Sequence, residues 1–69
     1  MTQNQMVALK NGSKLRHYDG YYVEYYRVVG RHKDVRNLYH MVNIDTKRDT
    51  GEDTVSHDEL NTSEWSLEE

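Results

Sequence analysis

Residues 21–30 are Tyr-Tyr-Val-Glu-Tyr-Tyr-Arg-Val-Val-Gly, and they form the strongest secondary-structure signal in the chain. Aromatic and β-branched side chains favour strands because they pack well on a pleated, half-buried surface. The closing glycine is a typical strand terminator. The stretch therefore predicts a strand over residues 21–29, in a register that places Tyr25 and Val29 inward.

Three further segments carry strand patterns. Residues 14–18 precede the turn dipeptide Asp19-Gly20, which predicts a hairpin into the first stretch. Residues 37–44 alternate apolar and polar side chains with a period of two, the pattern of a strand. A polar turn over residues 45–52 then leads to a short fourth strand over residues 53–56.

The ends of the chain give weaker signals. Residues 1–9 are polar and unpatterned and a turn signal follows them, so we expect residues 1–13 to be a flexible leader to a domain over 14–69. Residues 57–60 predict a single helical turn, because Ser56 can accept from the backbone of Glu59 as an N-cap. The last segment is either a short helix capped by Thr62 or Ser63, or a fifth strand over residues 64–67.

Length and composition limit the fold class. The 69 residues include no Cys, Phe or Pro, six Tyr and one Trp, so the core is thin and lacks disulfides. Tyrosine buries its ring but needs a partner for its hydroxyl, which suits strands with one wet edge. We expect a mostly β fold, a small SH3-like barrel of four to five antiparallel strands with a helical turn near the C-terminus. A homodimer would add buried surface.

Three segments carry a resemblance to a known family. They are Leu-Arg-His-Tyr-Asp-Gly (15–20), Tyr-Tyr-Arg-Val-Val-Gly-Arg-His (25–32) and Val-Ser-His-Asp-Glu-Leu (55–60). Together they resemble an uncharacterised family of short bacterial and phage proteins that open with an Arg-His-Tyr-Lys-Gly-type motif. This chain differs in having Asp19 where a lysine is usual and in lacking the proline of the last turn. The resemblance implies an SH3-like barrel and carries no functional residue.

The charge is unevenly divided along the chain. Residues 1–36 carry seven Lys or Arg against three acids, a net charge of +4, and residues 37–69 carry two against nine, a net charge of −7. No Lys or Arg follows Gly51. Such asymmetry bears on partners rather than on fold.

The acidic half suggests the first functional hypothesis. Its carboxylates could imitate a phosphate array and cover the basic site of a host nucleic-acid-binding protein, as in a phage-type inhibitor that mimics DNA. Trp65 would supply the apolar anchor of that interface. The predicted partner-binding residues are Glu52, Asp53, Asp58, Glu59, Glu64, Trp65 and Glu68. The alternative is that these acids form a solvated surface and Trp65 closes the core.

The Tyr/Arg-rich segment suggests the runner-up, a module that binds nucleic acid directly. Aromatic rings stack on bases while basic side chains neutralise phosphate. The candidate residues are Arg16, Tyr22, Tyr26, Arg27, Arg31 and Lys33. Against this reading, the overall charge is −3 and phosphate repels the acidic half. A third possibility is a domain with an unknown ligand.

Catalytic and metal-binding patterns are weak. The chain has no Cys, no nucleophile elbow and no phosphate loop, so we expect a binding protein and not an enzyme, with no cofactor. The four histidines lack the spacing of a metal site. A calcium loop at Asp45, Asp49 and Glu52 is disfavoured because Lys47 and Arg48 intrude. No apolar stretch spans a membrane, so we expect a cytoplasmic protein.

Overall fold

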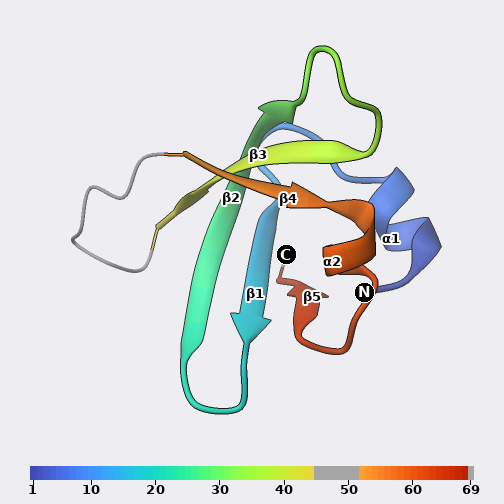
Figure 1. Ribbon diagram of the computed structural model, residues 1–69. Coiled ribbons are helices and arrows are strands. Elements are labelled where there is room, and N and C mark those ends of the chain that lie inside the picture. Colours follow the sequence, from blue (N-terminus) through green and yellow to red (C-terminus); the bar gives the residue numbers. More distant parts are fainter. Residues whose placement is uncertain (45–51, 69) are drawn as a thin grey trace.

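The computed structural model describes residues 1–44 and 52–68, which form a single antiparallel sheet with two short helices (Figure 1). The strands are β1 (Lys14–Tyr18), β2 (Val23–Arg31), β3 (Leu38–Asn43), β4 (Glu52–Ser56) and β5 (Trp65–Leu67), and the helices are α1 (Gln3–Val7) and α2 (His57–Leu60). The spatial order is β4-β3-β2-β1-β5. This confirms the predicted mostly β fold with five antiparallel strands. The sheet is broadly SH3-like but open, because its edge strands β4 and β5 do not pair with each other.

Two local predictions are confirmed, and one strand is displaced. Residues 14–18 form β1, and residues 57–60 form α2 with the Ser56 hydroxyl accepting from the Glu59 amide at 3.3 Å. The strand predicted over residues 21–29 begins later, at Val23. The Asp19 carboxylate accepts the amides of Tyr21 and Tyr22 at 2.8 and 2.9 Å, which holds both tyrosines in the turn.

The C-terminal segment is a strand, which settles the open choice between helix and strand. Residues 65–67 pair with β1, with Trp65 opposite His17 and Leu67 opposite Leu15. The predicted polar turn over residues 45–52 lies mostly outside the described residues, and Glu52 itself belongs to β4.

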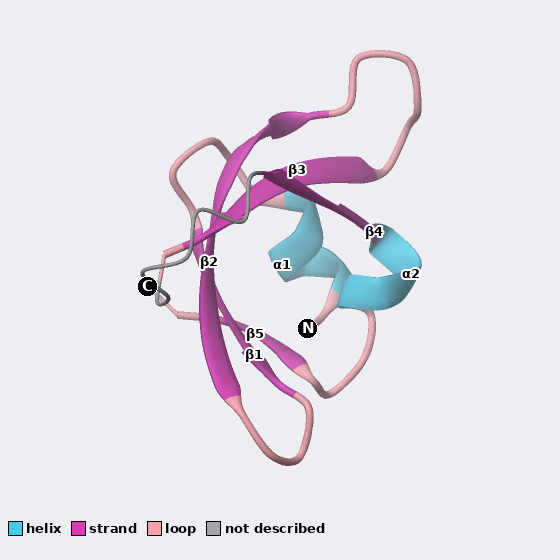
Figure 2. Ribbon diagram, turned by 60° about the vertical axis from the view of Figure 1, so that its left-hand side comes forward, coloured by secondary structure: helices cyan, strands magenta, loops and turns pink. Residues whose placement is uncertain are grey.

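The core lies against one face of the sheet, which we call the inner face. Both helices lie on this side of the curved sheet (Figure 2). Strands β1 to β5 and the helical segments contribute to one buried apolar cluster. Its members are Met6, Leu9, Leu15, Val28, Tyr39, Met41, Val55, Leu60 and Trp65.

The predicted register of β2 is wrong by one residue. Val28 is 1% exposed while Val29 is 38% exposed, so Val28 faces the core. Tyr26 packs against the core and lies opposite Leu15, whereas Tyr25 lies opposite Arg16. Because successive side chains of a strand alternate between faces, pairing with β1 places Tyr26 and Val28 on the inner face.

The first residues differ from the predicted flexible leader. Thr2 caps α1 with a capping box, and Met6 and Leu9 are buried in the core. The Tyr39 hydroxyl donates to the Met6 carbonyl at 3.3 Å. The Met1 amino group donates to three backbone carbonyls between residues 60 and 65, at 2.8–3.0 Å. The packed domain therefore includes residues 1–9 and does not begin at residue 14.

Candidate binding site

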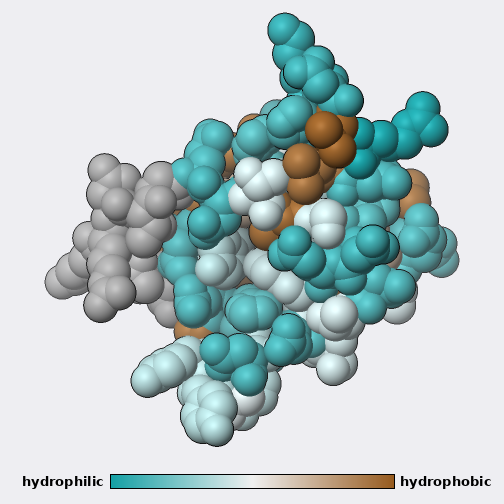
Figure 3. All heavy atoms as spheres, in the orientation of Figure 1, coloured by the Kyte–Doolittle hydropathy of each residue, from teal (hydrophilic) through white to brown (hydrophobic). Residues whose placement is uncertain are grey.

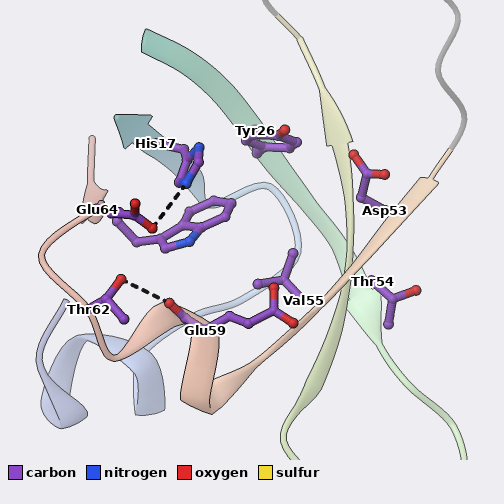
Figure 4. A pocket seen from close by; sticks show the side chains of 9 residues that line it. His17, Tyr26, Asp53, Thr54, Val55, Glu59, Thr62 and Glu64 are labelled. Carbon is purple, nitrogen blue, oxygen red and sulfur yellow. Dashed lines mark hydrogen bonds and ion pairs between the residues drawn. The ribbon is translucent and has the colours of Figure 1, made fainter. Parts of the chain in front are cut away.

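A cleft of about 540 Å³ opens on the inner face, where the two edges of the sheet stay apart. Strands β1, β2, β4 and β5 line it together with α2 and the following turn (Figure 4). The lining residues are His17, Tyr26, Asp53, Thr54, Val55, Glu59, Thr62, Glu64 and Trp65. The cleft thus occupies the place where a closed barrel would have joined β4 to β5.

Three aromatic rings form one wall of the cleft. The Trp65 ring lies 4.5 Å from the His17 ring and 5.3 Å from the Tyr26 ring, measured between centroids. His17 and Tyr26 meet edge to face at 6.5 Å. The strand register brings these rings together. His17 of β1 pairs with Trp65 of β5, and Leu15, the next residue of β1 on the same face, pairs with Tyr26 of β2. Trp65, which contacts both other rings, is only 7% exposed.

Three carboxylates surround these rings. Glu64 lies 3.7 Å from the His17 imidazole, between Oε2 and Nε2, and forms an ion pair when that ring is protonated. Glu59 is held in α2 by the Ser56 cap, and the Thr62 hydroxyl donates to its carbonyl at 3.1 Å. Asp53 approaches from β4. Among the described residues, this lining includes no Lys or Arg, so the cleft carries negative charge.

A fourth carboxylate positions the tyrosine of the wall. Glu24 accepts from the Tyr26 hydroxyl at 3.1 Å and from the Asn43 amide nitrogen at 2.6 Å. Burial raises the pKa of Tyr26, and the bonded Glu24 carboxylate raises it further. Tyr26 therefore stays a neutral hydrogen-bond donor, with its ring held against Trp65.

The structure brings together only part of the predicted partner-binding set. Asp53, Glu59, Glu64 and Trp65 line the cleft. Three other acids lie elsewhere. Glu52 pairs with His40 at 3.6 Å on the opposite face, Asp58 is exposed on α2, and Glu68 follows β5.

Four lining residues were in neither predicted set: His17, Thr54, Val55 and Thr62. His17 shares the strand face of buried Leu15, so alternation along β1 was the signal that could have found it. Thr62 was considered only as a helix cap. Tyr26 was assigned to nucleic-acid binding, although it belongs to the cleft wall.

The other residues of the predicted nucleic-acid set lie in two regions outside the cleft, the outer face of β1–β2 with its turn and the far end of β2. Arg16 and Arg27 lie on the outer face of the sheet, opposite the core-facing positions of β1 and β2. Tyr22 lies in the β1–β2 turn and Lys33 in the β2–β3 loop. The Arg31 guanidinium lies over the Tyr39 ring, 5.5 Å from its centroid, and donates to the Leu9 carbonyl, so this side chain helps to pack the first residues.

Residues 1–44 and 52–68 contain no group of three or more His, Asp or Glu side chains arranged to hold a metal ion. No helix in that part of the chain is long and apolar enough to cross a membrane. A scan against protein-family models and searches of curated proteins and solved structures found no match to this chain. The family resemblance of residues 15–60 stays a prediction.

Proposed function

We propose that this chain is a non-catalytic binding module that seats a basic side chain of a partner protein in the acidic cleft. The proposal rests on one observation: three carboxylates and three aromatic rings line the same cleft. A cation over an accessible aromatic face gains about 0.5–2 kcal/mol. Carboxylates at the rim add hydrogen bonds to an ammonium or a guanidinium group.

The predicted partner class, the basic site of a host nucleic-acid-binding protein, belongs to this proposal. Such sites display Lys and Arg side chains for phosphate, and these are the groups that fit the cleft. A phosphate-like array made from the whole acidic half receives less support, because Glu52 and Glu68 lie outside the cleft. The proposed mimicry therefore rests on Asp53, Glu59 and Glu64.

An arginine-rich hexapeptide tests the proposal, with a citrulline version as the uncharged control. Binding is measured by calorimetry and by the fluorescence of Trp65, the single tryptophan of the chain. The double variant Glu59→Gln/Glu64→Gln should weaken binding by about 5- to 30-fold, equivalent to a loss of about 1–2 kcal/mol. Binding should also weaken as salt rises, because the carboxylates are exposed.

The matched control is Asp58→Asn/Glu68→Gln, which removes the same charge outside the cleft. This variant should retain nearly the wild-type affinity. Equal loss in both double variants would assign binding to diffuse negative charge. Equal affinity for the arginine and citrulline peptides would refute recognition of a cation.

A further inference from the structure

The outer face of β1 and β2 carries a row of basic and aromatic side chains. Lys14, Arg16 and Tyr18 alternate along β1 with the inner residues Leu15 and His17. Their partners on β2 are Arg27, Tyr25 and Val23, in that order. On these six paired positions every charged side chain is basic.

Tyrosines extend this row into the β1–β2 turn. Tyr21 is 88% exposed, Tyr22 is 72% exposed and Tyr18 is 44% exposed. In Figure 3, pale side chains project at the lower end of the molecule, where Figure 1 places this turn. These exposed rings are available to stack on the bases of a ligand.

The cations and the rings are already associated. The Lys14 ammonium lies 4.9 Å from the Tyr25 ring centroid, and the Arg16 guanidinium lies 5.6 Å from that of Tyr18. These contacts keep positive charge beside flat apolar surfaces. This combination suits single-stranded nucleic acid, because its phosphates bind cations and its unpaired bases stack on aromatic rings.

We propose that the outer face of β1–β2, with the tyrosines of its turn, binds single-stranded nucleic acid. The row is about 13 Å long at ~3.3 Å per strand residue. A strand stacked at the duplex rise of ~3.4 Å per nucleotide would place about four nucleotides along it. The three cleft carboxylates lie on the inner side of the sheet, away from this row.

Two acids border the surface without interrupting the row. The Asp19 carboxylate accepts the amides of Tyr22 and Tyr21, which lower its pKa, and it thereby holds the turn that displays the tyrosines. Glu68 lies at the β5 side, where its amide donates to the Lys14 carbonyl. The Arg27 guanidinium donates to the Gly12 carbonyl at 2.9 Å, so Lys14 and Arg16 are the main cations for phosphate.

Fluorescence anisotropy with a labelled oligothymidylate of about twelve nucleotides tests the proposal. The double variant Lys14→Gln/Arg16→Gln should weaken binding, and its slope of log affinity against log salt should be shallower by about 1.4, or ~0.7 per lost phosphate contact. Tyr22→Ala should weaken binding by about 5- to 150-fold if one base stacks on this ring.

The matched control is Lys33→Gln/Arg36→Gln, which removes the same charge from the β2–β3 loop and should leave the salt slope unchanged. Circular dichroism checks that each variant folds. The cleft variant Glu59→Gln/Glu64→Gln should retain nucleic-acid binding, so failure of the cleft proposal and failure of this one are distinguishable.

Three results would overturn the inference. The wild-type chain could leave the oligothymidylate unbound at about 50 mM salt. Both double variants could lose affinity and salt slope equally, which would indicate a diffuse field. A duplex of the same length, or vesicles of anionic lipid, could bind as tightly as the single strand and be unaffected by Tyr22→Ala, which would identify a general polyanion surface.

Discussion

The inner and outer faces of the sheet are built from the same strands, but they differ in charge and in whether helices pack against them. On β1, His17 joins an acidic cleft that α2 helps to line, while neighbouring Arg16 lies on the basic outer face, away from both helices. On β2, Tyr26 belongs to the cleft wall and Tyr25 to the outer row. Because side chains alternate along a strand, neighbouring residues lie on opposite faces of the sheet, one acidic and one basic.

This difference shows why net charge describes neither surface. The total of −3 combines a cleft lined by three carboxylates with an outer row whose charged members are basic. A charge acts on a partner mainly within a Debye length, about 8 Å at physiological salt. The two proposed binding surfaces can therefore be tested separately.

The largest effect is expected where α1 covers the inner face. Met6→Ala should cost about 2–5 kcal/mol of unfolding free energy, because its fully buried side chain leaves a cavity. The adjacent exposed control Val7→Ala should change the stability by less than about 0.5 kcal/mol. Urea denaturation measures both, and equal values would mean that residues 1–9 do not pack on the sheet.

A second matched pair tests the faces of β2. Val28→Ala should cost about 1–3 kcal/mol because it removes two buried methyl groups. Val29→Ala, on the half-exposed side, should cost no more than about 0.5 kcal/mol. A larger loss of stability in Val29→Ala than in Val28→Ala, measured by thermal or urea unfolding, would show that Val29 faces the core. That result would contradict both binding proposals.

A smaller effect is expected at the cap that positions Glu59 in the cleft. Ser56→Ala removes the acceptor of the Glu59 amide and should cost about 1 kcal/mol. The affinity for the arginine peptide should fall with it, while oligothymidylate binding should not change. Ser63→Ala, in the exposed turn after α2, is the control, and a loss of nucleic-acid binding in Ser56→Ala would couple the two faces.

The smallest effect concerns Tyr26 at high pH. Its pKa is raised above the ordinary tyrosine value of 10.0 in the folded chain, first by burial and then by Glu24. The unfolded chain therefore loses this proton first, so stability should decline as the pH rises above 10. The Tyr26→Phe variant should lose this part of the decline and Tyr25→Phe should keep it, as measured by urea midpoints on either side of pH 10. The same decline in all three proteins would disprove the assignment.

Local signals were sufficient for several elements. The Asp19-Gly20 dipeptide located the end of β1, and Ser56 three residues before Glu59 located α2. These motifs satisfy backbone groups with side chains nearby in the chain, so they act without tertiary contacts.

Other features depend on packing. Helix α1 has only five residues, and helices so short owe their stability to tertiary contacts, here those of Met6. Its sequence therefore resembles a loose leader. The β2 register was equally ambiguous, because adjacent pairs of Tyr (25 and 26) and of Val (28 and 29) offer each face the same side chains.

Part of the candidate cleft could be predicted from the sequence. The acids and Trp65 of the C-terminal third were recognised as a group, since their composition is local. The sequence did not show which of these residues lie in the cleft and which lie outside it. That division follows from the pairing of β4 with β3 and of β5 with β1.

Composition and short-range pattern alone established a thin, disulfide-free, mostly β domain with its positive and negative charge in separate halves of the chain. The tertiary structure decided which side chains of each strand share a face, that the sheet stays open, and that His17 meets Trp65 across 48 positions of sequence. Such choices depend on the register between distant strands. A shift of one residue exchanges the faces without altering any local signal, so only the packing of the whole core selects among them.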